Sequence, residues 1–213
     1  KLNISVNNDS SDITSNTDNS SDIDLISNAS RLGFKGQVDM KNGLTGIYQI
    51  EYQVDITDDD KDADFDQRNS FVGLKGNFGT FKLGTHDTPL KLAQLKADLF
   101  NDLKGDIKNT HDGENRIGSF LGYDSPVFGG GVSISLSLGK GKDDGINTDL
   151  DGEFGNNISV SLKYDIDVIK FVIATENNSI KGYDHNRLGM MIPAGPVTIG
   201  LIHTTTCLLY TSD

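Results

Sequence analysis

The 213-residue chain contains no tryptophan, one cysteine and only four prolines. Because Cys207 is the single cysteine, neither a disulfide framework nor a thiolate metal cluster can form within this chain. No segment approaches the roughly 18 continuous apolar residues of a membrane-spanning helix. Basic residues are also scarce, with 19 Lys and Arg against 31 Asp and Glu and a net charge of −12. This deficit excludes a nucleic-acid-binding protein that works through a basic face.

Glutamate is rare as well, because only four of the acidic residues are Glu and the remainder are Asp. Glu favours helices, whereas Asp favours turns and loops, where its short side chain bonds nearby backbone. Together with 24 glycines, this composition predicts strands and turns. The chain begins at Lys1 without Met or an apolar signal region, so we expect either a cytosolic protein or a mature or truncated chain whose export signal is gone.

Apolar residues recur at every second position. Between Leu44 and Val54 one parity is almost entirely apolar or aromatic and the other almost entirely polar, and residues 132–138 and 158–164 repeat the pattern. Weaker versions cover residues 31–38, 81–83, 169–173 and 197–201. This alternation predicts an all-β, antiparallel fold of about eleven strands with two distinct faces.

The connections between these strands alternate between short and long. The short ones are Asp39–Gly43, Asn77–Gly79, Asp124–Gly130, Asp165–Asp167 and Pro193–Pro196. The long polar ones are Asn7–Ile26, Asp55–Gln67, His86–Asn115, Gly139–Asn156 and Glu176–Asp184. An up-and-down barrel in an outer membrane has this arrangement, with short turns on the periplasmic side and long loops outside. Residues 44–54 also have the length of roughly 9–11 residues that a spanning strand needs.

Alternation alone does not say which face is wet, since a soluble sheet and a membrane barrel give the same pattern. The polar parity, however, carries many cations. They are Arg31, Lys35, Arg68, Lys75, Lys82, Arg116, Lys163 and Lys170. So many charges on one side of a closing sheet favour a water-filled interior and an apolar, lipid-facing exterior.

Short motifs follow one another in order through the first 130 residues. They are Ser30–Gly36 (Ser-Arg-Leu-Gly-Phe-Lys-Gly), Asn42–Gln49, Arg68–Gly76 (Arg-Asn-Ser-Phe-Val-Gly-Leu-Lys-Gly), Asn77–Thr80, Leu83–Gly84, Asp87–Leu90, Gly113–Arg116 and Ser125–Gly130. Taken together they resemble the general porins of Gram-negative bacteria, trimeric diffusion channels of the outer membrane. The rhythm of the strands extends this resemblance to about Thr205.

The resemblance implies a transmembrane β-barrel of about sixteen strands, with the third long loop folded inward to narrow the pore. Here that constriction loop covers about residues 86–115, and its run Leu90–Phe100 has apolar residues at helical spacing. By itself this run would be read as a surface amphipathic helix. The resemblance implies that it lies inside the barrel.

The resemblance also implies basic residues on the wall facing acids on the loop. Carried over by motif, the basic wall comprises Arg31, Arg68 and Arg116, with Lys1 a candidate for the same row and Lys35, Lys75 and Lys82 as further cations. The loop acids are Asp98, Asp102 and Asp106. Opposed charges across a narrow aperture create a transverse field that orients polar solutes and hinders apolar ones. Arginine suits the wall because it stays charged at any relevant pH.

The chain departs from the family in its number of strands and in its last residues. An open sheet of about eleven strands would leave two long unpaired edges. The tail 206–213 does not continue the pattern and resembles translated adapter sequence, a possible sequencing artefact. We therefore expect residues 1–205 to be an incomplete barrel lacking its signal, the start of its first strand and its C-terminal strands. Cys207, in the tail, carries no functional weight.

Other motifs do not support a catalytic or metal site. The acidic run Asp58–Asp66 has part of the spacing of a calcium loop, but Phe65 and Phe71 replace the turn glycine and the bidentate glutamate. Gly139–Gly145 lacks the ending of a phosphate-binding loop, and the four histidines show no metal-ligand spacing. We expect no enzyme activity, no catalytic residue, no metal and no cofactor.

The strand and loop pattern together with the resemblance predict an outer-membrane porin, here incomplete, that passes small hydrophilic solutes and ions by passive diffusion. The resemblance implies a homotrimer surrounded by outer-membrane lipid and lipopolysaccharide, with no nucleic-acid partner. The alternative is a binding module, a β-sandwich or barrel acting as an adhesin or surface receptor without transport. Acidic outer loops and a basic wall act in opposite directions on ion preference, which therefore stays open.

Overall fold

The computed structural model describes residues 1–9, 22–57, 65–140, 153–177 and 183–208. Its strands are β1 (Ile4–Asp9), β2 (Asp22–Ser27), β3 (Arg31–Asp39), β4 (Thr45–Val54), β5 (Phe65–Gln67), β6 (Ser70–Gly76), β7 (Gly79–Asp87), β8 (Arg116–Asp124), β9 (Val132–Gly139), β10 (Asn157–Ile166), β11 (Ile169–Asn177), β12 (Tyr183–Ala194) and β13 (Val197–Leu208). Helical segments are one α-helical turn, α1 (Pro89–Leu92), and two 3-10 turns, η1 (Lys41–Gly43) and η2 (Ile107–Asn109).

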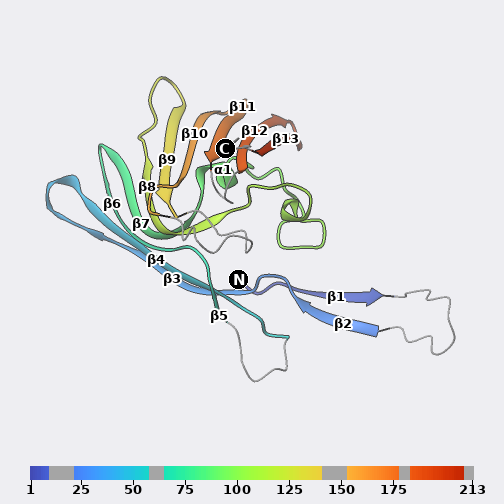
Figure 1. Cartoon of the computed structure of the whole chain (residues 1–213). Helices are drawn as coiled ribbons and strands as arrows, with labels where there is room; N and C mark the ends of the chain where they lie inside the picture. Colours follow the sequence, from blue (N-terminus) through green and yellow to red (C-terminus); the bar gives the residue numbers. More distant parts are fainter. Residues whose placement is uncertain (10–21, 58–64, 141–152, 178–182, 209–213) are drawn as a thin grey trace, which may run out of the picture.

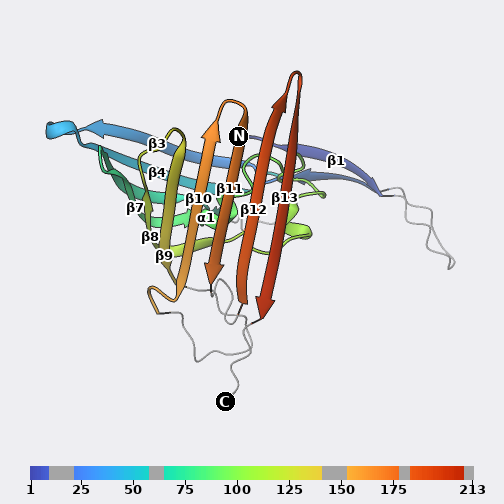
Figure 2. The ribbon, with the colours of Figure 1, turned by 90° about the horizontal axis from the view of Figure 1, so that it is seen from above.

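Eleven strands form one antiparallel sheet in which neighbours in sequence are neighbours in space. Its order runs β13-β12-β11-β10-β9-β8-β7-β6-β4-β3, and β5 pairs with β4. Strands β1 and β2 form a separate hairpin that projects away from the sheet (Figure 1). The row β9 to β13 is plain from above in Figure 2. This up-and-down order confirms the predicted all-β, antiparallel fold.

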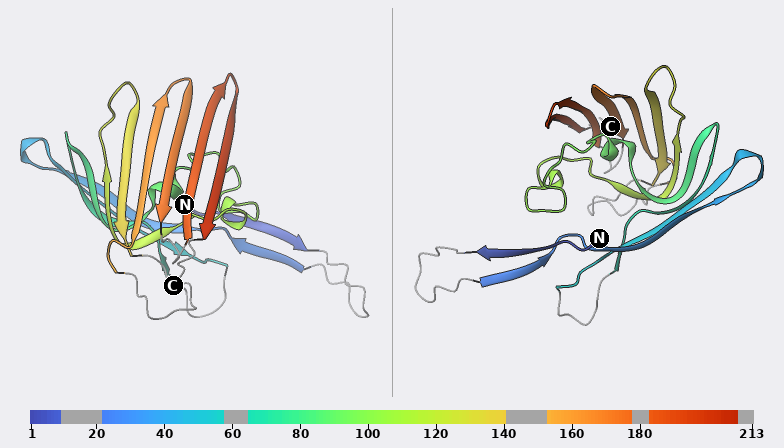
Figure 3. Two further views of the ribbon diagram at one scale, coloured as in Figure 1. Left: turned by 45° about the horizontal axis from the view of Figure 1, so that its top comes forward. Right: turned by 180° about the vertical axis from the view of Figure 1, so that it is seen from behind.

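The sheet is strongly curved, and the long segment between β7 and β8 lies on its concave side (Figures 1 and 3). We call this segment, residues 88–115, the inward loop. The first turn of α1 begins at Thr88, whose Oγ1 accepts a hydrogen bond from the Lys91 backbone N–H, and Pro89 stands at its first helical position. Both features are typical helix starts. Within the described ranges, no helix is long and apolar enough to cross a membrane.

The polar face of the sheet is the covered one. Along β10, Ser159 is fully buried under the inward loop, whereas Leu162, on the other face, is 42% exposed. Phe34 on β3 is 70% exposed. The same inversion recurs along the convex face, where large apolar side chains stand exposed. They include Leu32, Val72, Leu83, Ile158, Ile173 and Ile199. A soluble sandwich buries its apolar parity, so this inversion resolves the ambiguity of the alternating pattern in favour of a membrane barrel.

The buried apolar cluster lies between the loop and the wall. It comprises Leu90 and Ala93 from the inward loop and Val172 and Ala174 from β11, with Leu95 packed against it. The wall therefore holds the loop partly by burying apolar surface.

Some expected connections contain strand. The long stretch 7–26 begins in β1 and ends in β2, and 55–67 ends in β5. Strand β13 continues through Cys207 to Leu208, pairing Cys207 with Asp184, so three residues of the expected tail are strand. Polar residues on the wet face of a strand have a loop-like composition, which hides such ends. Residues 58–64, most of 139–145 and 209–213 lie outside the described residues, so the acidic run, the glycine-lysine run and the last tail residues are not placed.

Candidate functional site

The tip of the inward loop contacts the wall at Arg31. The Arg31 Nη2 lies 2.8 Å from Asp102 Oδ1 and 2.6 Å from Asp102 Oδ2. Lys1 Nζ donates to the same carboxylate at 2.6 Å. Backbone hydrogen bonds between Lys1 and Arg31 set these two cations side by side. Asp102 itself has a φ of 68°, a left-handed conformation that Asp tolerates better than most residues.

These contacts govern the charge of the Asp102 carboxyl. Burial by itself would raise its pKa, but the hydrogen bond from Lys1 and the positive charge of Arg31 act in the opposite direction and prevail. The pKa of Asp102 is therefore below its ordinary value, and the loop tip carries a fixed negative charge against the wall.

The other two predicted loop acids bond the backbone of the loop. Asp98 accepts hydrogen bonds from the Phe100 and Ile107 backbone N–H groups at 2.9 and 3.2 Å. Asp106 caps η2 by accepting from the Lys108 N–H, and its Oδ2 accepts from the Asp102 N–H at 2.8 Å. Both carboxylates therefore fix the shape of the loop that presents Asp102. Their assignment to the aperture stays a prediction.

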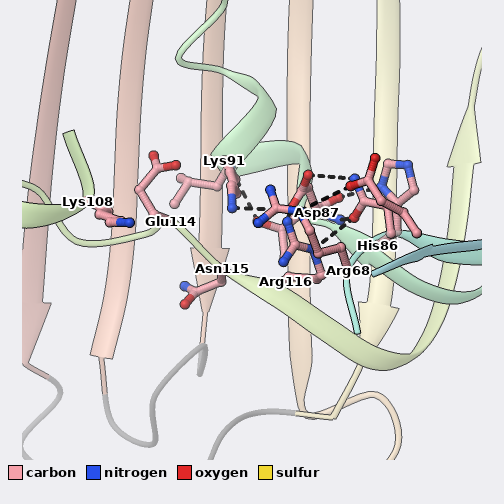
Figure 4. Close-up of polar contacts among 12 residues, drawn as sticks. Arg68, His86, Asp87, Lys91, Lys108, Glu114, Asn115 and Arg116 are labelled. Atoms are coloured by element: carbon pink, nitrogen blue, oxygen red, sulfur yellow. Dashed lines mark hydrogen bonds and ion pairs between the residues drawn. The ribbon is translucent and has the colours of Figure 1, made fainter. Parts of the chain in front are cut away.

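Arg116, at the start of β8, contacts the acid that ends β7. Its Nη2 lies 3.0 Å from Asp87 Oδ1, and Lys91 of the inward loop reaches the same oxygen at 3.2 Å. Asn69 links the two partners by accepting from Arg116 Nε and donating to Asp87 Oδ2. Figure 4 shows this convergence of Arg116, Lys91 and Asp87, with Arg68 beside it.

Arg68 lies just before β6 and pairs with the wall rather than with a loop acid. Its Nε lies 3.1 Å from Glu51 Oε1, and its Nη1 donates to Gln53 Oε1 at 2.9 Å. Figure 4 shows Arg68 next to Arg116, so positive charge is concentrated on this part of the wall.

The predicted lysines have different surroundings. Lys35 on β3 and Lys75 on β6 are exposed. Lys82 on β7 pairs with Asp124 of β8 at 2.9 Å and lies 5.6 Å from the Phe71 ring centroid. A cavity of about 350 Å³ opens beside the loop-tip contact, and Lys1, Arg31, Lys35, Gln49 and Glu51 are among its lining residues.

Sequence reasoning missed the most heavily bonded arginine, Arg187 of β12. Its side chain is fully buried, and its Nη1 lies 2.6 Å from Glu114 Oε1 in the returning part of the inward loop. Only its place on the polar parity of β12 could have indicated it, because the family motifs end near Gly130. Within the described residues, no three His, Cys, Asp or Glu side chains are grouped so as to hold a metal ion.

A curved antiparallel meander that is apolar outside, charged inside and crossed by an inward loop defines an outer-membrane β-barrel. Comparison with known proteins agrees. The sequence matches the Gram-negative porin family over residues 2–204. The chain belongs to that family, whose members are outer-membrane channels and not enzymes.

One relative is the major outer membrane protein P.IB of Neisseria meningitidis serogroup A, which is 29% identical over 77% of this chain and 52% of its own length. Among solved structures, Salmonella typhi OmpF in complex with daunomycin superposes with a TM-score of 0.71 at 17% identity, covering 96% of this chain and 63% of OmpF. The anion-selective porin from Comamonas acidovorans gives 0.67 at 22% identity, covering 96% and 65%. The chain thus spans about half the length of the curated relative and under two thirds of either structure.

Proposed function

We propose that the protein forms a water-filled channel through which small hydrophilic solutes and ions cross the outer membrane by passive diffusion. The observation that carries this proposal is the contact of Asp102, at the tip of the inward loop, with Arg31 and Lys1 on the wall. It sets acid against base inside a concave, polar surface. Such an aperture holds ordered water and a transverse field, which favour polar solutes.

The basic side of the aperture is supplied by Arg31, Arg68 and Arg116, with Lys35, Lys75 and Lys82 contributing charge further along the wall. Asp102 is the acid that faces this side, and Asp98 and Asp106 hold the loop in shape. The cavity lined by Lys1, Arg31 and residues of β3 and β4 supports a solute path beside the tip of the loop. Catalysis, a metal and a cofactor have no part in this function.

Residues 1–205 belong to an incomplete barrel whose wall is the eleven-stranded sheet, and further strands complete it. The coverage of the relatives supports this, since each is longer than the segment it shares with this chain. The exposed apolar convex face contacts outer-membrane lipid and lipopolysaccharide or neighbouring subunits of a homotrimer. The trimer rests on family membership.

Reconstitution of the full-length protein in a planar bilayer tests the proposal. Stable, ohmic conductance steps support a channel, and the reversal potential under a salt gradient reports whether the basic wall or the acidic loops dominate ion preference. Absence of conductance from a correctly folded barrel would instead favour the adhesin or receptor alternative. A soluble module would also stay monodisperse without detergent, whereas the exposed apolar face predicts aggregation.

A further inference from the structure

We propose that Arg187 is the residue that positions the inward loop, with Glu176 as a second attachment point on the same wall. This inference rests on the proposed function. It adds a residue that lies outside the aperture and determines the shape of the aperture by positioning the loop. Arg187 lies on β12 and Glu176 on β11, far along the sheet from Arg31 on β3.

Arg187 bonds both limbs of the inward loop at once. Its Nη1 donates to the Leu90 carbonyl oxygen at 3.3 Å, on the limb that enters the lumen. The same atom donates to Glu114 Oε1, and Nη2 donates to the Asp112 carbonyl oxygen at 2.8 Å, both on the returning limb. One side chain therefore fixes the separation of the two limbs.

The remaining guanidinium nitrogen ties the side chain to the wall. Nε donates to Thr204 Oγ1 of β13 at 3.1 Å. A planar guanidinium can satisfy several acceptors in different directions, whereas a lysine ammonium on its flexible stem cannot reproduce that fork. Because the side chain is fully buried, its charge must be paired, and removing it would leave Glu114 without its partner in a poorly solvated place.

Glu176 holds the base of the loop. This residue is fully buried, and its Oε1 accepts from Asn115 Nδ2 at 3.2 Å and from Asn157 Nδ2 at 3.3 Å. Asn115 is the last residue of the loop, and its carbonyl oxygen accepts from the Thr88 N–H at the start of the loop. The two ends of the loop are thus joined to each other and to β10 and β11.

Two glycines let the entering limb lie directly on the wall. A Cβ built on Gly189 of β12 would collide with the Ala93 carbonyl oxygen, and one built on Gly200 of β13 would lie 2.8 Å from Ala97 Cβ. The entering limb therefore rests against β12 and β13, and the tip of the loop reaches β3 through Asp102. The cavity beside Lys1 and Arg31 lies on the other side, next to the tip.

A disulfide trap measures the position of the loop without relying on conductance. In the full-length protein carrying Cys207→Ser, Ala97→Cys and Gly200→Cys place two thiols at the loop–wall contact. Their Cβ atoms need to separate by only about 1 Å to reach disulfide geometry. Gel mobility with and without reductant measures the fraction of protein in which the disulfide has formed. Heat-modifiable mobility verifies that each variant has folded as a barrel.

With Arg187 present, we expect rapid disulfide formation on mild oxidation. Arg187→Met should slow it by at least about tenfold, because the loop spends most of its time off the wall. Arg187→Lys should fall between the two. The matched control is Lys163→Met. Lys163 is a cation of β10 on the polar face of the sheet, but it pairs with Asp165 and not with the loop. This substitution should leave the rate of disulfide formation unchanged.

An unchanged rate in folded Arg187→Met would overturn the proposal. If that variant does not fold, Arg187→Lys decides, and a wild-type rate in it would equally overturn the proposal. The proposed function and the role of Arg187 can be refuted independently. If the protein conducts but the rate of disulfide formation does not depend on Arg187, the channel stands and the positioning role of Arg187 is refuted. If the rate depends on Arg187 but the protein does not conduct, Arg187 positions the loop of a barrel that is not a channel.

Discussion

Asp102 and Arg31 are 71 positions apart in the chain, yet two contacts of 2.8 and 2.6 Å join their charged groups. One stands at the tip of the inward loop and the other at the start of β3. This contact holds the tip of the loop, the part farthest from the base of the loop, against the wall. In the proposed channel this pairing sets acid on the loop against base on the wall, which gives the aperture its polarity.

Removing the Asp102 charge should shift ion preference toward anions. Asp102→Asn leaves Arg31 and Lys1 uncompensated, so the aperture gains net positive charge. Hydrogen bonds to charged groups contribute roughly 1.5–3 kcal/mol each. Because Lys1 is half-exposed, we expect the free energy of the contact between the tip and the wall to weaken by an amount at the low end of that range. The reversal potential measures the shift. Asp39→Asn, an exposed acid at the other end of β3, is the control; an equal shift from it would refute the role of Asp102.

Neutralising the arginine row should have the opposite effect. Replacing Arg31, Arg68 and Arg116 by Gln removes the positive charges that the wall presents to the loop, and permeation should move toward cations. The same salt-gradient measurement detects it. Lys163→Gln with Lys170→Gln removes charge near a short turn instead and should have a smaller effect. An unchanged reversal potential in the triple variant would mean that the constriction lies elsewhere.

Acid should loosen the loop tip only at low pH. A carboxyl whose folded-state pKa is lowered contributes stability above its ordinary pKa of about 3.9 and loses it as pH falls through the lowered value. The Asp102 contact should therefore persist to about pH 4 and fail below it. Open-channel noise recorded on stepping from pH 6 downward should rise only in that range. Because Asp102→Asn lacks the titrating group, the same rise in that variant would contradict the assignment.

Filling the space under the loop should disturb it even though the change is remote from the charges. A methyl group at Gly189 would meet the Ala93 carbonyl oxygen, so Gly189→Ala should destabilise the loop–wall contact by about 1–3 kcal/mol, as overpacking does. Thermal unfolding and conductance noise report it. Gly46→Ala on β4 is the matched control, since its nearest neighbours would lie 3.8 Å away. Equal effects of the two substitutions would rule out a specific role for Gly189.

Alternation alone was enough to predict the sheet, because strands facing lipid on one side and water on the other must change polarity at every residue. It identified the polar parity of β10, where Ser159 is buried, but not what buries it. That depends on the inward loop, whose position the family resemblance supplied. The ends of strands are predicted less accurately. Strands β1 and β2 extend into a stretch whose polar composition is typical of a connection.

At Arg31 and Arg116 a family motif and a strand coincide, and the structure places both side chains in contact with an acid, Asp102 and Asp87 respectively. Their role in an aperture stays a prediction. Sequence reasoning did not identify Arg187, because its contacts are with Leu90 and Glu114, which are far away in sequence. No local pattern encodes such contacts. Asp98 and Asp102 look alike in sequence, and only the fold of the loop turns one toward its own backbone and the other toward the wall.

Single-channel recording from the full-length protein in a planar bilayer under a salt gradient tests the central claim most directly. The account predicts large, stable, ohmic steps whose reversal potential moves in opposite directions in Asp102→Asn and in the triple arginine variant. A folded, heat-modifiable barrel that gives no conductance would contradict it.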